Sequence, residues 1–246
     1  MGEVLSQPRY RLHILTSRAR HLLGRRHSLR TPPGYFGALL TNAVHHRAMG
    51  ALLERVNFST TAGPRSDAGA ALFFAIHGYR TRQVRLDEMN FNAPLQASCS
   101  IPFVLRSVHD IPGAPPGAYW DGGITDYHLH LNYNAVAPAS EPDAPGLVLY
   151  PHFQKAIVPG WLDKGLKWRH HATHFLDNVI VLAPDPAWVK TLPYGKLPDR
   201  TDFTRYGKDL AGRVKAWSLA VDASRSLVDE FQGWIERHDM SRVAAL

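Results

Sequence analysis

The sequence predicts an α/β fold with a mainly parallel sheet, and three observations lead to this expectation. The chain has 246 residues, of which 45% are hydrophobic and 20% are charged, as in globular chains of one or two domains. Short continuous apolar runs at residues 70–76, 147–150 and 178–182 have the pattern of strands buried on both faces. Segments with a helical spacing of apolar residues alternate with these runs, which is typical of α/β proteins.

The first 56 residues predict one strand and two helices. Partial alternation of apolar and polar residues over Tyr10–Leu15 indicates a strand. Arg18–Leu29 is a basic segment with helical character, and a break follows at Thr31–Gly34. Apolar residues over Phe36–Val44 repeat at helix spacing, and we expect Ala51–Val56 to extend this helix, although an intervening glycine weakens the extension.

The middle of the chain predicts a short helix and then an extended segment. Asn92 is typical of a helix N-cap, and Pro94 falls in the first turn, where its missing N–H costs nothing. We expect this helix to stop before Pro102, and residues 103–108 to be extended. Loops are predicted at residues 111–118, 135–146 and 184–202.

A long amphipathic helix is predicted at the C-terminus. Its seam residues are spaced alternately by four and three, and seven of the eight are apolar. They are Leu210, Val214, Trp217, Val221, Ser224, Val228, Phe231 and Ile235. We expect residues 201–246 to be a helical extension packed on residues 1–200; a dimerising coiled coil is the alternative, which Ser224 in the seam disfavours.

Positive charge is concentrated near the N-terminus. The chain carries a net charge of +7, yet residues 4–53 hold eight arginines, among them Arg18, Arg20, Arg25 and Arg26, and no acidic residue. This segment fits the headgroups of an anionic membrane surface. The alternatives are a nucleic-acid surface, which no recognised module supports, and an ordinary surface paired with acidic residues elsewhere.

The chain lacks the marks of a secreted or membrane-spanning protein. Its longest apolar run, at residues 70–76, is far shorter than the roughly 18 residues that a transmembrane helix needs. The first residues of the chain include an acidic residue, and no apolar signal region follows them. Cys99 is the single cysteine, so an intramolecular disulfide is excluded. We expect a cytoplasmic protein, either free in solution or peripheral to a membrane.

Two sequence blocks are the most specific feature of the chain. The first, LQASCSIPF, covers Leu95–Phe103, and the second, YWDGGI, covers Tyr119–Ile124. Together and in this order they resemble the patatin-like phospholipases, which have an Ala-Ser-x-x-x-Pro helix end, an extended segment, and then an aromatic residue before Asp-Gly-Gly. The matching residues are Ala97, Ser98, Pro102, Tyr119, Asp121, Gly122 and Gly123. The resemblance implies a three-layer α/β fold with a mainly parallel central sheet.

The resemblance also implies a role for Asp121. In that family the aspartate is the partner of a serine nucleophile, in a Ser–Asp dyad that attacks a lipid ester carbonyl. The residues themselves indicate a tight turn at the end of a strand, with Gly122 and Gly123 allowing positive φ or close approach of another backbone. The alternative is an aspartate that only closes the turn. Asp126, five residues on, is expected to be dispensable for the chemistry.

The nucleophile half of such a domain is missing from the sequence. No G-x-S-x-G occurs in the chain, and neither does the Gly-rich turn that supplies the oxyanion hole. Residues 1–200 therefore look like the later part of a patatin-like domain, and we expect the missing elements to be encoded upstream of Met1. Ser98, Cys99 and Ser100 are poor nucleophiles because a helix C-terminus disfavours an anion.

Histidines offer two further hypotheses. His170, His171 and His174 have the H-H-x-x-H spacing of metal ligands, with Asp163 or Asp177 as the added carboxylate, but the metalloprotease Glu is absent. His128 and His130 alternate on a predicted strand, so they share one face and either line a pocket near Asp121 or meet solvent.

The sequence thus leads to a lipid acyl hydrolase acting on a lipid ester, to which this chain supplies the aspartate. No metal or organic cofactor is implied. The alternatives are a non-catalytic relative that binds lipid or a partner, and a metal-dependent hydrolase that uses the three clustered histidines.

Overall fold

The structure is a computed structural model, and it describes residues 1–7, 10–20, 50, 52–60, 74–75, 78–102, 104–133 and 146–246. The chain forms two compact units. The first comprises Met1–Val148 and Ile157–Val179, and the second comprises Leu149–Ala156 and Ile180–Leu246. Residues 180–200, which the predicted boundary assigns to the first domain, thus belong with the C-terminal helices.

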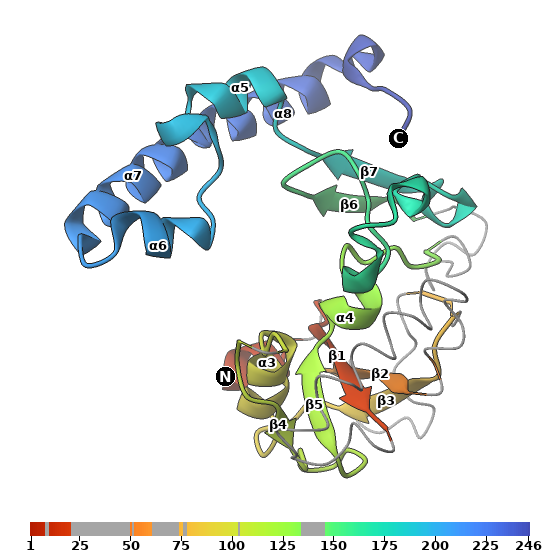
Figure 1. The fold of residues 1–246 in the computed structure, drawn as a ribbon. Helices are drawn as coiled ribbons and strands as arrows, with labels where there is room; N and C mark the ends of the chain where they lie inside the picture. Colours follow the sequence, from red (N-terminus) through yellow and green to blue (C-terminus); the bar gives the residue numbers. More distant parts are fainter. Residues whose placement is uncertain are drawn as a thin grey trace. The chain divides into compact units, whose positions relative to one another are not determined.

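A five-stranded sheet forms the framework of the first unit (Figure 1). Its strand order is β3-β2-β1-β5-β4. The strands are β1 (His13–Ala19), β2 (Leu53–Ser59), β3 (Thr81–Arg85), β4 (Val108–His109) and β5 (Ala118–Asp121). Mixed helices and strands confirm the broad α/β expectation.

The expected mainly parallel arrangement is not found among the described strands. Within the five-stranded sheet, β1 runs antiparallel to both β2 and β5, β4 runs antiparallel to β5, and β2 and β3 are the one parallel pair. Part of the reason is chain length. Only residues 110–117 connect β4 to β5, and a parallel pair needs a crossover of about a dozen residues or more.

β2 occupies sequence that was expected to extend a helix, so that prediction is wrong. All seven residues of Leu53–Ser59 are buried, and four of them have polar side chains with partners inside the protein: Glu54, Arg55, Asn57 and Ser59. A strand that is covered on both faces is usually recognised in a sequence by a continuous apolar run. The polar residues of β2 interrupt that run, so its sequence does not resemble a buried strand.

Two hydrophobic clusters cover the sheet. The first contains Ala19, Leu53, Tyr79, Ala118, Trp120 and Ile124. The second contains Ile14, Val56, Phe58, Val84, Leu86, Ala97, Ile111 and Tyr119. Neighbours in β5, Tyr119 and Trp120, belong to different clusters because successive strand residues point to opposite faces. The described helices of this unit are α1 (Gly2–Leu5), α3 (Asn92–Ser98) and α4 (Gly123–Asp126).

Several local expectations for the first unit are corrected. The helix predicted from Asn92 is present, but Phe91 holds the N-cap position and Asn92 is already helical. Residues 104 and 105 form a turn on the Ile101 carbonyl instead of an extended strand. The basic segment predicted as helical begins inside β1, and its residues 21–29, like the helix predicted over 36–44, lie outside the described residues. Most of the apolar run at residues 70–76 also lies outside the described residues.

A second, two-stranded sheet contains the two predicted strands of the later sequence. β6 spans Val148–Pro151 and β7 spans Val179–Leu182. Neither strand is buried: Leu149 is 50% exposed, although its apolar run was expected to lie inside the protein. Short 3-10 helices lie between these strands, at Trp161–Asp163 (η3), Lys167–Arg169 (η4) and His174–Leu176 (η5).

Helices dominate the second unit (Figure 1). They are α5 (Pro186–Thr191), α6 (Thr201–Tyr206), α7 (Leu210–Ala223) and α8 (Arg225–Arg237), with 3-10 turns at Pro193–Gly195 (η6) and Met240–Arg242 (η7). α5 corrects the loop predicted over 184–202. Its signals are present in the sequence, because the Asp185 side chain accepts the Ala187 N–H at 2.7 Å and Pro186 begins the helix.

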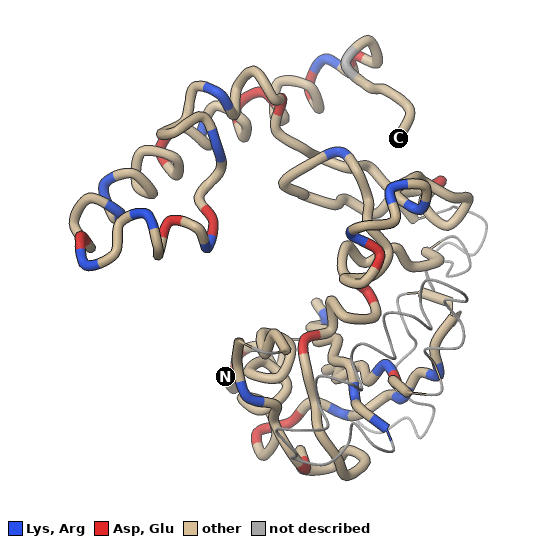
Figure 2. Tube along the Cα trace, in the orientation of Figure 1, with Lys and Arg blue, Asp and Glu red and all other residues tan. Residues whose placement is uncertain are grey.

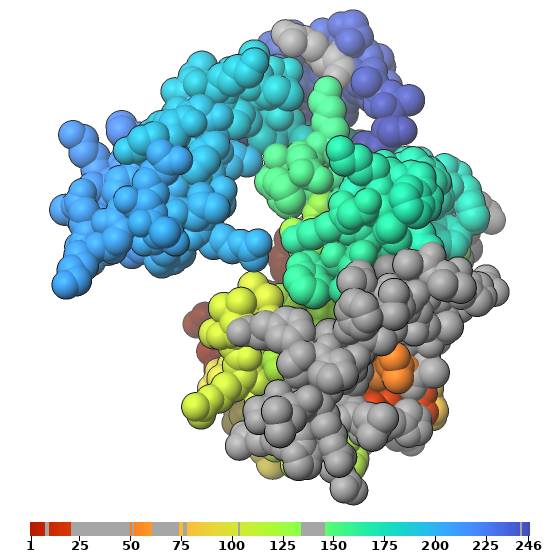
Figure 3. All heavy atoms as spheres, in the orientation of Figure 1, coloured from red at the N-terminus to blue at the C-terminus, as the bar shows by residue number. Residues whose placement is uncertain are grey.

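The predicted C-terminal helix is divided at Ser224, which ends α7 and begins α8. Its expected seam is largely open: Leu210, Val214, Val221 and Val228 are each more than half exposed. The residue of α7 that is buried is Ala220, one position off that seam. Figure 3 shows side chains projecting from this layer of helices.

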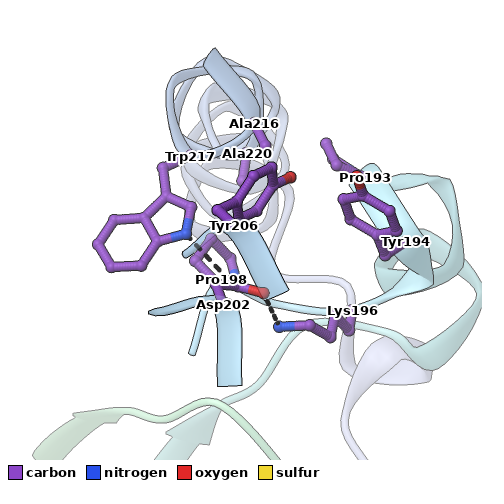
Figure 4. Close-up of a pocket in the computed structure, with 9 residues that line it drawn as sticks. All are labelled: Pro193, Tyr194, Lys196, Pro198, Asp202, Tyr206, Ala216, Trp217 and Ala220. Carbon is purple, nitrogen blue, oxygen red and sulfur yellow. Dashed lines mark hydrogen bonds and ion pairs between the residues drawn. The ribbon is translucent and has the colours of Figure 1, made fainter. Parts of the chain in front are cut away.

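A small cavity lies between α6, α7 and η6 in the second unit (Figure 4). At about 10 Å³ it has room for a single water molecule, so it is not a ligand site. Buried Asp202 stands at its centre, forms an ion pair with Lys196 Nζ at 2.8 Å and accepts a hydrogen bond from Trp217 Nε1 at 3.0 Å. The cavity is therefore part of the packing that fixes α6 to α7.

Candidate functional site

The first sequence block forms the end of α3 and packs against β1. Ala97 is fully buried, and Pro102 is buried as well. The Ser98 hydroxyl donates a hydrogen bond of 2.8 Å to the Leu15 carbonyl oxygen. Leu15 belongs to β1, the central strand of the described sheet, so this serine anchors the helix end to the sheet and is not presented as a nucleophile.

The second block, the Asp-Gly-Gly turn, meets the same residue of β1. A Cβ atom on Gly122 would lie 2.3 Å from the Leu15 carbonyl oxygen and 2.7 Å from its carbon. Real Cβ atoms do not come this close to a rigid backbone, so glycine is required here by close approach. The alternative use of glycine, a positive φ, does not apply, because Gly122 has φ −61°.

The two blocks are therefore brought together around one backbone position. Ser98 contacts the Leu15 carbonyl from one block, and Gly122 lies against it from the other. The Asp121 N–H adds a direct link by donating to the Ser100 carbonyl oxygen at 3.1 Å. Residues separated by about 20 positions in the sequence thus form one contiguous structure.

Asp121 ends β5 and is half-buried, as expected for a carboxylate at the carboxyl end of a strand. Its Oδ1 accepts the Gly123 N–H at 2.7 Å, which is the turn-closing hydrogen bond. Burial raises the pKa of the Asp121 carboxyl above its ordinary value, and this hydrogen bond and the charge of Lys164 oppose the rise. A carboxylate with a raised pKa is better suited to accept a proton near neutral pH.

Lys164 and Tyr127 lie close to this turn. The Lys164 ammonium stands 4.1 Å from the centre of the Tyr127 ring, a cation–π contact. A Cβ on Gly123 would lie 3.3 Å from that ring and 3.0 Å from Asp121 Oδ1. Lys164 is exposed and follows η3, so an ammonium group, an aromatic face and the aspartate are all near one another.

A buried ion pair fixes the helix that follows the turn. Arg55 on β2 donates from Nε to Asp126 Oδ2 at 2.7 Å and from Nη2 to Asp126 Oδ1. Both residues are buried, at 1% and 4% exposed. Thr125 Oγ1 donates to Asp126 Oδ2 and also bonds Ser17 Oγ on β1. Asp126 is therefore a structural anchor of α4, and it is a poor control for variants of Asp121.

The two histidines expected to share a strand face do not share one. Residues 127–129 form turns, and Leu129 has φ +46°, so the alternation of a strand is lost. The His128 Nδ1 accepts the Val158 N–H at 2.9 Å, whereas His130 Nε2 is 2.8 Å from Thr173 Oγ1. Each ring thus holds a different part of segment 157–179 against the turns after α4.

The clustered histidines have separate partners. His170 Nε2 is hydrogen-bonded to the Asp163 backbone oxygen at 2.8 Å, and the His174 ring packs edge-on to Phe175. The Asp163 carboxylate pairs with Arg169 at 2.8 Å and accepts the Gly160 N–H. Within the described residues, no group of three His, Cys, Asp or Glu side chains is placed to hold a metal ion.

The basic N-terminal segment is partly described. The Arg18 guanidinium is 2.5 Å from Glu54 Oε2 and also donates to the Pro116 carbonyl oxygen. Arg18 is therefore committed to contacts inside the protein, and Arg25 and Arg26 lie outside the described residues. No helix in the described part of the chain is long and apolar enough to cross a bilayer.

Sequence reasoning missed Lys164, Tyr127 and Arg55. Lys164 lies in an unremarkable polar stretch, and its proximity to Asp121 depends on how segment 157–179 returns to α4. Arg55 carried no signal because a lone arginine in a sequence is normally exposed. Searches against family models, curated proteins and solved structures found nothing that matches this chain.

Proposed function

We propose that this chain supplies the general-base half of a patatin-like lipid acyl hydrolase, with Asp121 as the base. The observation that carries the proposal is the meeting of the two sequence blocks at Leu15. The Ala-Ser-x-x-x-Pro helix end and the Asp-Gly-Gly turn are conspicuous in the sequence, and in space they build one rigid support for a single half-exposed carboxylate.

The chemistry follows from the state of that carboxylate. Asp121 accepts one backbone N–H, and its second oxygen has no hydrogen-bond donor among the described residues. A serine hydroxyl supplied by a segment outside this chain would donate its proton there as its oxygen attacks the ester carbonyl, forming an acyl-serine and releasing the alcohol. Asp121 gives this proton to the departing alkoxide, which leaves as the alcohol. In the second step Asp121 takes a proton from the water that attacks the acyl-serine and returns it to the serine oxygen as the fatty acid is released.

The DNA upstream of Met1 provides the first test. We expect it to encode, in frame or after one frameshift, a Gly-rich turn followed by G-x-S-x-G, because the later blocks are useless for hydrolysis without them. An upstream region full of stop codons and without these motifs would contradict the proposal of a divided domain.

The second test is Asp121→Asn in the longer chain that includes this upstream sequence. Asparagine keeps the shape and can accept the Gly123 N–H, but it cannot take a proton from serine. Ester hydrolysis should fall by about 10²–10⁴-fold while the circular dichroism spectrum is unchanged. The matched control is Asp177→Asn, an exposed aspartate of the same unit, which should retain full activity.

A non-catalytic relative is the second candidate, and the hydrogen bond from the Gly123 N–H to Asp121 favours it. In that case Asp121 only closes the turn. Neither the wild type nor Asp121→Asn would then hydrolyse esters above the background rate, and a lipid-binding assay would give the same affinity for both proteins.

A further inference from the structure

The carboxylate of Glu54 is surrounded by three arginines, although one would neutralise it. Arg18 Nη1 lies 2.5 Å from Oε2, while Arg80 Nε and Arg82 Nε lie 3.1 and 3.0 Å from Oε1. The cluster therefore carries two positive charges in excess of its one negative charge. Figure 2 shows basic positions gathered along the strands of this sheet.

The three arginines differ in exposure. The Arg18 side chain is 18% exposed, and its other N–H groups donate to the Pro116 carbonyl oxygen at 3.0 and 2.8 Å. Arg18 and the 1% exposed Glu54 thus form a closed pair. Arg80 and Arg82 are 52% and 47% exposed, and within the described part of the chain Glu54 is the only carboxylate that either of them pairs with.

The strand register places Arg80 and Arg82 side by side. Val56 of β2 is the partner of Arg82, and Arg55 is the partner of Thr81, so Arg80 falls opposite Glu54. Residues two apart on a strand point to the same face. Both guanidinium groups contact the same Glu54 oxygen with Nε, and none of their terminal N–H groups has a partner among the described residues.

We infer that Arg80 and Arg82 form a binding site for a phosphate group. Glu54 is one carboxylate shared by three guanidinium groups, so repulsion among them remains, and a second anion bound at the exposed ends of Arg80 and Arg82 reduces it. Planar guanidinium groups donate paired hydrogen bonds that match the oxygens of a phosphate. The site lies along β3 and does not involve Asp121, so the inference can be tested independently of the proposed hydrolysis.

The source of the phosphate is either a soluble phosphate compound or the headgroup of an anionic phospholipid. The full 246-residue chain is titrated with inorganic phosphate while backbone amide NMR shifts are followed, with sodium chloride at equal ionic strength as reference. In parallel, its co-sedimentation is measured with vesicles of phosphatidylcholine alone and of phosphatidylcholine mixed with phosphatidylglycerol. The variants are Arg80→Gln, Arg82→Gln and, as matched control, Arg85→Gln, an exposed arginine of the same strand without a described acidic partner.

We expect each of the first two variants to weaken binding by roughly tenfold or more, and Arg85→Gln to leave it near the wild-type value. Saturable phosphate shifts in residues 80–82 identify a site for soluble phosphate compounds. Sedimentation only with the anionic vesicles, with the same dependence on variants, identifies a headgroup site. Absence of binding in both arms, or an equal loss in Arg85→Gln, overturns the inference. Arg80→Lys and Arg82→Lys keep the charge, so intermediate affinity in them separates paired hydrogen bonding from charge alone.

Discussion

Glu54 and Arg55 are adjacent on β2 and are both 1% exposed, yet they form two different kinds of ion cluster. Arg55 meets one carboxylate with two of its nitrogens, so its charge is balanced and its hydrogen bonds are aligned with Asp126. Glu54 meets three guanidinium groups, two of which are about half exposed. The balanced cluster can only hold the protein together, whereas the unbalanced one keeps charge available for a ligand.

The largest expected effect comes from breaking the balanced pair. Asp126→Asn removes the only carboxylate described beside a fully buried guanidinium, so we expect the free energy of unfolding to fall by about 3–5 kcal/mol. Urea denaturation measures this loss. The double variant Arg55→Met, Asp126→Leu removes both charges and should recover much of it. A single variant as stable as the wild type would mean that the pair contributes nothing.

In the cluster around Glu54, replacing the carboxylate should lower the free energy of unfolding more than replacing one of its half-exposed arginines. Glu54→Gln removes the one carboxylate described beside three guanidinium groups, and we expect a loss of about 2 kcal/mol in the free energy of unfolding. Arg82→Gln removes one half-exposed partner and should cost less than about 1 kcal/mol, because Arg18 still neutralises Glu54. Equal losses in the two variants would show that all three arginines are structural.

Asp121 provides a third case, a carboxylate that pairs with no described guanidinium, and here we expect the smallest effect. Its pKa is raised by burial, so this group favours the folded state while it is protonated, and that contribution is lost as the pH rises through its folded-state pKa. Asp121→Asn should therefore be as stable as the wild type at acidic pH and slightly more stable near neutral pH. Urea denaturation from about pH 3 to about pH 7 measures the difference. Greater stability of the wild type at neutral pH would show that the charged carboxylate stabilises the fold.

The local features of the candidate site could be predicted because they depend on nearby residues. Asp121 at a strand end, a glycine beside another backbone and a helix ending before Pro102 all follow from short-range chemistry. Even so, the reason for Gly122 was open between positive φ and close approach, and the sequence holds no sign that Leu15 is the approaching residue.

The long-range features were not predictable in the same way. The sequence predicts a helix extension over the start of β2, because the polar residues Glu54 and Arg55 hide the pattern of a buried strand. Their partners, Arg80 and Asp126, come from distant parts of the chain and become visible only when the strand order is known. The periodic pattern at the C-terminus predicted helices, but of its seam residues in α7 Trp217 contacts Asp202, whereas Leu210, Val214 and Val221 are more than half exposed.

The Arg55–Asp126 pair also has a consequence for the order of folding. The two residues are 71 positions apart, so their contact closes a long loop of chain, which is entropically costly and slow. Before β2 and α4 come into contact, the Arg55 and Asp126 side chains remain hydrated. The cost of removing this water is compensated only when the two elements dock and the ion pair forms. We expect the turn that carries Asp121 to become rigid late, after the local hairpin of β4 and β5 has formed.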